Sequence, residues 1–269
     1  MIRLPNHPLP EPAHSRLVEY QGEIDSLPDY EARVERAKTR FGGLNRKGEP
    51  TFDSVKATLS KMCVGVQRCA YCEDSLADEV EHIRPKALYP DWVFAWMNYL
   101  YACGPCNGPK NSHFAVFAQG TGTLTNVGRR RGDPVTPPVA GHPVLLDPRM
   151  DDPTAFMRLD LVDTFFFTAS AAPGTVDHQR AKYTIDLLGL NRREALPRTR
   201  RAAYQDYRAH LSQYVNERNQ GNEPEHLLRL ADEIRTRQHA TVWLEMKRQH
   251  LLIPTLKRLF EAAPEALGW

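Results

Sequence analysis

The sequence predicts an α+β fold in which a small cysteine-rich module lies between two largely helical regions. Apolar residues recur at helical spacing near the N-terminus and again from residue 177 to the end. Between these regions, four of the five cysteines form two Cys-x-x-Cys pairs, a pattern typical of a metal-stapled module. We expect four segments: an arm with helices (1–62), the cysteine-rich module (63–118), a Pro- and Gly-rich connection with a short hairpin (119–176) and a helical region (177–269).

Length and composition are those of an ordinary globular protein. The 269 residues suffice for one large domain, and 41% hydrophobic with 25% charged residues exclude disorder along the whole chain. A formal charge of +2 excludes a histone-like polycation, so binding of nucleic acid would need local positive charge. The start, MIRLPNHPLPEP, lacks the apolar core of a signal peptide, and no apolar run approaches the ~18 residues that cross a bilayer. We therefore expect a cytoplasmic protein with no membrane segment.

The N-terminal segment predicts an extended arm followed by two helices. Four prolines within residues 1–12 favour the arm. Helical spacing from His14 to Arg40 predicts one helix, which Phe41-Gly42-Gly43 is expected to end. A second, short helix is expected from Asp53 to Met62.

The second half of the chain predicts a loop, a hairpin and then helices. Residues 119–153 are rich in Gly and Pro and predict a long irregular connection. The apolar residues of 157–167, followed by a Gly- and Pro-containing turn, predict a short β-hairpin. Apolar positions from Leu196 to Tyr214 predict a long amphipathic helix, and two more helices follow, the last divided or kinked at Pro254. Such apolar stripes usually serve core packing.

The cysteine spacing predicts a structural zinc site. Cys69 and Cys72 form one pair, Cys103 and Cys106 the other, and 30 residues separate the pairs. Two such knuckles offer four thiolates in a tetrahedron, which suits Zn²⁺, and this closed site leaves no open position for catalysis. A redox dithiol would need a thioredoxin-like context that the sequence lacks. Because the cysteine count is odd, complete disulfide pairing in a monomer is excluded, and Cys63 is expected to be a buried free thiol.

The residues between and after the cysteine pairs resemble the HNH nuclease family, whose zinc-stapled members contain a ββα-metal motif. Glu81-His82 matches the acid-His pair of the first strand, Asn98 the middle Asn, and Asn107 the last His or Asn on the following helix. Lys110 matches a Lys often found three residues later. The resemblance implies a ββα-metal nuclease module within residues 63–118, embedded in the helical additions.

The chemistry of these residue types agrees with the roles that the resemblance implies. His82 is neutral near pH 7 and can take a proton from water. Glu81 and the Asn107 amide oxygen are hard ligands for Mg²⁺ or Mn²⁺, and Lys110 supplies positive charge for a phosphate. By analogy, Asn98 ties down the connecting loop and orients His82. Because neighbours on a strand face opposite sides, Glu81 and His82 would need a bend or bulge at the strand end to line one site.

Two departures from the family pattern affect the metal site. Many members carry Asp before the His, and the longer Glu81 moves the carboxylate outward. Asn107 replaces His in the last position, which makes the site oxygen-rich and favours Mg²⁺ over a soft metal. His113, six residues further on, is a second candidate for that position. Taken singly, each of these residues is more often a surface, turn or helix-start residue, and their co-occurrence between the cysteine pairs favours the functional interpretation.

A narrower resemblance is to the PtuB-like HNH nucleases of Septu and retron anti-phage systems. It covers roughly residues 50–205 and includes Pro85-Lys86 after the acid-His pair, Leu146-Asp147-Pro148, and Leu188-Gly189-Leu190-Asn191. It implies an effector nuclease that works with a PtuA-like ATPase. The helices of residues 177–269 carry no catalytic motif and offer a docking surface for an ATPase or for a second copy of the chain in a homo-oligomer.

Basic and aromatic clusters are candidate contacts for nucleic acid. Arginines can bind phosphates, and aromatic rings can stack on bases. For a basic cluster, a charged face that only contacts solvent is an equally good interpretation. For the aromatic residues, packing around the zinc site is favoured over stacking. The candidates are Arg129, Arg130 and Arg131 in a glycine-flanked loop, Arg192 and Arg193 before the long helix, and Tyr89, Trp92 and Trp96 between the predicted strands.

The sequence thus predicts an HNH endonuclease that hydrolyses DNA phosphodiester bonds with Mg²⁺ or Mn²⁺, as the effector of a bacterial anti-phage system with an ATPase partner. Two alternatives stay open. One is a standalone restriction or mobile-element HNH nuclease, which needs no ATPase. The other is a catalytically idle zinc-knuckle subunit that brings nucleic acid to a partner.

Overall fold

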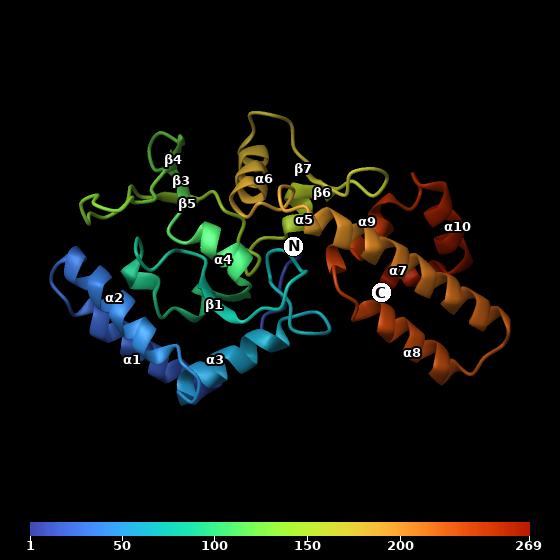
Figure 1. The fold of residues 1–269 in the computed structure, drawn as a ribbon, viewed down its shortest axis with the longest axis horizontal. Coiled ribbons are helices and arrows are strands. Elements are labelled where there is room, and N and C mark those ends of the chain that lie inside the picture. The colour runs from blue at the N-terminus through green and yellow to red at the C-terminus, as the bar shows by residue number, and fades with distance from the viewer.

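The computed structural model describes residues 1–269 and contains ten α-helices and seven short strands. The strands form three separate small sheets, so the fold is a mixture of helices and small sheets. Helices α1–α3 lie on one side of a central hairpin and helix, and α7–α10 form a second helical region at the C-terminal end (Figure 1).

Three helices make up the N-terminal segment: α1 (Glu11–Asp25), α2 (Tyr30–Leu44) and α3 (Pro50–Lys61). The expected single helix from His14 to Arg40 is wrong, because the chain breaks between α1 and α2 at Pro28 and Asp29. Proline disfavours helical backbone in the residue before it, and the Asp29 carboxylate caps the new helix by accepting the Ala32 N–H at 3.1 Å. Helix α2 also continues through the two glycines to bury Leu44.

A two-stranded antiparallel hairpin and a short helix form the centre of the molecule. Strand β1 (Glu79–His82) pairs with β2 (Tyr99–Ala102), and α4 (Gly104–Lys110) follows β2 directly. The register runs from Glu79 opposite Ala102 to His82 opposite Tyr99, one residue to one, without a bulge. The connection between the strands contains the short 3₁₀ helices η1 (Pro90–Trp92) and η2 (Trp96–Asn98).

The N-terminal helices pack on one face of this hairpin. Nineteen buried residues form a cluster that joins α1–α3 to Val80 of β1 and to Tyr99 and Tyr101 of β2. Phe52 of α3 is fully buried there and lies 6.2 Å from the Tyr99 ring, centroid to centroid. The alternation of the strands puts His82 on this same face, against the N-terminal helices.

The expected irregular connection contains a small sheet instead. Strands β3 (Ala115–Ala118), β4 (Leu124–Asn126) and β5 (Gly141–Pro143) pair antiparallel in the order β4-β3-β5. The Gly141 backbone approaches β3 so closely that a Cβ would lie 2.2 Å from the Phe117 carbonyl oxygen. Glycine therefore permits the pairing here, whereas its abundance in the sequence indicated only a loop.

The next segment forms the expected hairpin beside a short helix. Helix α5 (Pro153–Phe156) leads into β6 (Met157–Leu159), which pairs antiparallel with β7 (Phe167–Ala169).

The C-terminal region is helical, as the sequence predicts. Its elements are α6 (Val176–Leu187), α7 (Ala195–Asn219), α8 (Pro224–Arg235), α9 (Ala240–Gln249), α10 (Pro254–Ala262) and the 3₁₀ helix η3 (Pro264–Gly268). Pro254 begins α10, a position where its missing N–H costs no helical hydrogen bond. None of the helices combines the length and the apolar character that crossing a bilayer requires.

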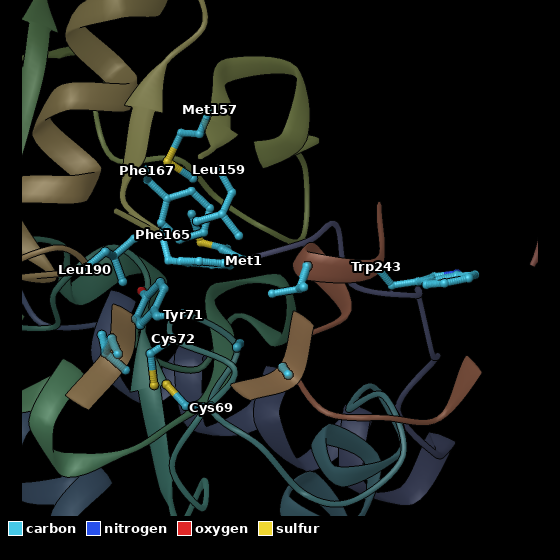
Figure 2. Close-up of a cluster of buried hydrophobic side chains, with 14 of the residues drawn as sticks. Met1, Cys69, Tyr71, Cys72, Met157, Leu159, Phe165, Phe167, Leu190 and Trp243 are labelled. Atoms are coloured by element: carbon cyan, nitrogen blue, oxygen red, sulfur yellow. The ribbon is translucent and has the colours of Figure 1, made fainter. Parts of the chain in front are cut away.

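A second, larger core connects the cysteine pairs to this C-terminal region. Its 39 buried residues include all four paired cysteines, the β6–β7 hairpin and residues of α6–α10. In Figure 2, Met157, Leu159, Phe165 and Phe167 lie together, and Tyr71 lies between this group and the sulfur of Cys72. Both cores cross the segment boundaries expected from the sequence, and those boundaries remain predictions.

Replacing Phe52 with alanine should lower the free energy of unfolding by about 3–5 kcal/mol, because it empties a fully buried site between α3 and the hairpin. Urea denaturation of the two proteins measures the difference. Leu228 of α8, which is 61% exposed, provides the control, and Leu228→Ala should change stability by less than about 0.5 kcal/mol. Equal losses in the two variants would contradict the packing of Phe52 between α3 and the hairpin.

Candidate metal centre and adjoining cleft

The two Cys-x-x-Cys pairs meet in one buried cluster. The sulfur atoms of Cys69, Cys72, Cys103 and Cys106 all lie within 4.8 Å of one another, and none forms a disulfide. Cys72 Sγ and Cys103 Sγ are 3.8 Å apart. Four buried thiols at these separations fit a tetrahedral Zn²⁺ site, the donor set that structural zinc prefers. Cys63, the fifth cysteine, is half-buried outside the cluster, and its thiol donates to the Arg68 carbonyl at 3.3 Å.

Local backbone geometry gives each pair its turn. The second pair spans the start of α4, where the Cys106 and Asn107 N–H groups donate to the Cys103 carbonyl at 3.0 and 2.9 Å. In the first pair the Glu73 N–H donates to the Cys69 carbonyl at 2.9 Å, and Glu73 itself has a left-handed φ of 61°. Both cysteines of a pair therefore face the same point.

Arg193 belongs to this cysteine cluster and not to an exposed basic surface. Its Nη2 donates to Cys106 Sγ at 3.1 Å, and its side chain is half-buried. Burial alone would lower the Arg193 pKa, but the adjacent Cys106 and Cys72 sulfurs outweigh it, and the net shift of the pKa is upward. A Zn²⁺ ion with four thiolates carries two negative charges, so a guanidinium at this distance offsets part of that buried charge. This contact gives Arg193 a role within the protein, and its predicted contact with nucleic acid stays a prediction.

Glu73 connects the first knuckle to the C-terminal helices. Its carboxylate accepts the Thr241 N–H at 3.2 Å and the Thr241 hydroxyl at 2.5 Å, at the start of α9. The ammonium group of Met1 donates to the same carboxylate at 2.8 Å. The knuckle is thereby held by contacts from chain segments more than 160 residues apart in sequence.

A cleft of about 410 Å³ lies beside the cysteine cluster, between β1, the loop after it, α4 and α2. It brings together three of the predicted site residues, Glu81, His82 and Asn107. The chain bends at Ile83 and Arg84, just after His82, whereas Glu81 and His82 themselves lie in the regular register of β1. The other polar residues that line the cleft are Lys38, Glu79, Lys86, Asn111 and Ser112.

His82 is buried and held in one orientation. Its ring lies edge-on to Phe41 and Tyr99, with centroids 4.4 and 5.2 Å away. Its Nε2 lies 3.0 Å from the Val93 carbonyl oxygen, which can only accept a hydrogen bond. Nε2 therefore carries the proton in the neutral ring, and Nδ1 is left as the acceptor. Burial, together with the positive charge of Lys86, holds the His82 pKa well below its usual value, so the ring is neutral at physiological pH.

Asn98 fixes the loop that orients His82. Its buried amide oxygen accepts the Arg84 N–H at 2.7 Å, and its amide nitrogen donates to the carbonyls of Arg84 and Trp92 at 3.1 and 2.8 Å. Trp92 precedes Val93, whose carbonyl contacts His82. The side chain does not line the cleft, and these contacts are of the positioning kind that the sequence suggested.

Lys110 lies beneath the cleft and not within it. Its ammonium group is fully buried, pairs with Glu81 Oε1 at 2.5 Å and donates to the His82 carbonyl at 2.7 Å. Its Nζ is already engaged with protein groups, so the prediction that Lys110 supplies charge for a phosphate gains no support from this placement. Burial raises the Glu81 pKa, while the charge of Lys110 opposes that rise.

Glu79 is the site residue that the sequence analysis missed. Its Oε2 accepts the Asn107 Nδ2–H at 2.6 Å. This hydrogen bond uses the amide nitrogen of Asn107, and the amide oxygen takes no part in it. It lies two residues before Glu81 and thus on the same face of β1, a spacing that could have indicated it. The carboxylates of Glu79 and Glu81 and the Asn107 amide oxygen are a donor set that fits Mg²⁺, which binds through one or two carboxylates and keeps several waters.

The remaining predicted residues lie outside this cleft. His113 contacts the Pro109 carbonyl at 3.1 Å and borders a separate hollow beside α6. Arg129 lies over the Tyr30 ring at 5.7 Å, Arg130 and Arg131 are exposed, and Arg192 donates to the Asp186 carbonyl. Of the aromatic residues, Trp96 is buried and Tyr89 lies edge-on to Phe114. Trp92 is exposed, and the Arg84 guanidinium lies 4.6 Å from the centre of its ring.

Cys72→Ser should remove bound zinc and lower the melting temperature, because zinc binding supplies folding free energy. Zinc content by atomic absorption and a thermal melt give the two readouts. Cys63→Ser is the matched control, and it should keep both the metal and the melting temperature. Retention of zinc by Cys72→Ser, or its loss from Cys63→Ser, would contradict the assignment of the four ligands.

Arg193→Ala should weaken zinc binding by about 10- to 100-fold, because groups that contact metal ligands tune affinity to this extent. Competition with a chromogenic chelator measures the change. Arg192→Ala removes the exposed neighbouring arginine and should leave zinc affinity unchanged. If both variants lose zinc equally, the Arg193–Cys106 contact has no special role.

Comparison with known proteins adds one partial similarity. No protein-family model matches the chain. A curated relative, the Septu protein PtuB of Bacillus thuringiensis, is 45% identical over 73 residues, which are 25% of this chain and 28% of that protein. The chain therefore matches little more than a quarter of the relative's length. Over that stretch the sequence is related to a Septu protein, and the cysteine cluster fits the zinc knuckle expected from the sequence.

Proposed function

We propose that this protein is a metal-dependent HNH-type endonuclease that hydrolyses DNA phosphodiester bonds and acts as the effector of a Septu-type anti-phage system. The observation that carries the proposal is the cleft in which neutral His82 lies beside two carboxylates and the Asn107 amide. The order of β1, β2 and α4, with the cysteine pairs before the first strand and at the helix start, supports the ββα-metal assignment.

His82 is the general base of this proposal. Its Nδ1 accepts a proton from the attacking water as that oxygen bonds to phosphorus, and the bond from phosphorus to the leaving oxygen breaks. The Val93 carbonyl holds the ring in the tautomer that this step requires. Asn98 acts as a positioning residue through the loop that contains Val93.

Glu79, Glu81 and Asn107 are the residues that would hold a hard divalent cation. Such a cation supplies charge that neutralises the phosphoryl oxygens and the leaving oxygen. Glu79 orients the Asn107 amide, and Lys110 holds the Glu81 carboxylate in place. The zinc knuckle has no open coordination position, so its contribution is to fix α4 and, with it, Asn107.

The partial similarity to PtuB supports the defence role and, with it, a PtuA-like ATPase as partner. The formal charge of the chain is only +2, so an assembly partner that helps to hold DNA agrees with the weak overall attraction for a polyanion. A catalytically idle nucleic-acid-binding subunit is the second candidate. The Glu81–Lys110 ion pair favours it, because it neutralises a carboxylate that a metal would need.

His82→Ala should reduce DNA cleavage at least 100-fold, because it removes the base that activates water. Plasmid nicking or linearisation with Mg²⁺, measured for the chain alone and with its ATPase partner, gives the readout. His113→Ala is the control outside the cleft and should cleave as the parent does. If the parent and His82→Ala give identical products in every condition, the protein is not a nuclease of this mechanism.

A further inference from the structure

The cleft contains two lysines that the proposed chemistry does not use. Lys86 follows β1 in the loop, and Lys38 lies on α2, outside the cysteine-rich module. Neither ammonium group forms an ion pair or a hydrogen bond with the protein, whereas Lys110 is engaged with Glu81 and His82. Lys38 and Lys86 are thus the unpaired cations that line the cleft.

Packing against one aromatic ring holds Lys86 next to His82. The Lys86 Nζ lies 5.0 Å from the centre of the Phe41 ring, and the His82 ring centre lies 4.4 Å from the same point. Lys86 is half-buried, and burial lowers its pKa. A partly desolvated ammonium group without an acidic hydrogen-bonding partner is costly, and an anion that docks beside it recovers that free energy.

Lys38 extends this positive surface toward solvent. It lies three residues before Phe41 on α2, so the two side chains are neighbours on one face of the helix. Lys38 is exposed, and it adds to the positive potential felt by Lys86. The two lysines form the cationic wall of the cleft, opposite in charge to Glu79 and Glu81.

We propose that Lys38 and Lys86 bind the phosphate backbone of a nucleic-acid strand next to His82. The inference rests on the proposed function and specifies the substrate as a polyanion that is recognised through its backbone. Contacts from lysine to phosphate position a strand and carry no base information, so this wall should bind without sequence preference. The N-terminal helices therefore contribute directly to substrate binding through α2.

Binding of a fluorescein-labelled DNA duplex to the full chain, in the His82→Ala background and over a range of salt, tests the wall without requiring cleavage. Lys86→Gln and Lys38→Gln should each weaken binding severalfold at low salt and make the slope of log K against log salt shallower by about one. Lys86→Arg keeps the charge and should keep the slope. Lys47→Gln removes an exposed lysine outside the cleft and should match the parent. Zinc content and circular dichroism check that each variant is folded.

Cleavage by the same lysine variants, with His82 restored, separates the two ideas. If cleavage requires His82 and the KM is higher for Lys86→Gln than for Lys47→Gln, the result supports both the nuclease and the cationic wall. Cleavage that requires His82 but is unaffected by the lysines overturns the wall and leaves the nuclease. Lysine-dependent binding without any cleavage by the parent, alone or with its ATPase partner, overturns the nuclease and leaves a phosphate-binding cleft. If the lysine variants bind DNA as Lys47→Gln does, or if the parent binds no DNA at all, the wall is wrong.

Discussion

The four-cysteine cluster is the constraint on which the rest of the structure depends. It joins two chain segments that are 30 residues apart, and it lies within the 39-residue core that also contains the C-terminal helices. Structural zinc in such a site contributes on the order of 10 kcal/mol or more to folding, as much as the net stability of a typical domain. The contacts around it, Arg193 on Cys106 and Glu73 on Thr241, come from the C-terminal half. Metal binding and the docking of these helices should therefore stabilise each other.

The cleft is positioned from two independent sides. From one side, the second cysteine pair fixes the start of α4, which places Asn107 against Glu79 of β1. From the other side, the N-terminal helices pack on the hairpin and hold His82 through Phe41. His82, the proposed base, and the candidate metal ligands thus belong to different layers, which meet along β1 because neighbouring strand residues face opposite sides. A change in either layer alone should therefore disturb the geometry between His82 and the carboxylates.

Most short-range patterns predicted the structure correctly, with the single helix expected from His14 to Arg40 as the exception. Features that depend on long-range packing were not predicted. The four-cysteine cluster and the C-terminal helices were both predicted from local sequence patterns, and the structure contains both. Lys110 and Arg193 look like ordinary surface cations in the sequence, and only the folded chain shows that they face Glu81 and Cys106. The sheet in the Gly- and Pro-rich stretch depends on a pairing partner, β3, that precedes it. The residue type shows that a side chain carries a charge, but only the tertiary structure shows whether that charge is paired within the protein.

The same distinction shows that the net charge of the chain does not by itself give the charge that an anion would meet in the cleft. Lys110 and Arg193 are basic residues whose charge is paired within the protein. Lys110 pairs with the Glu81 carboxylate, and Arg193 contacts the cysteine cluster through Cys106. A phosphate bound as proposed would meet the unpaired charge of Lys38 and Lys86, beside the negative charge of Glu79 and Glu81. A divalent cation on those carboxylates would reverse the sign of that side of the cleft. Attraction for nucleic acid should therefore rise when the metal site is filled, so that metal and substrate favour each other's binding.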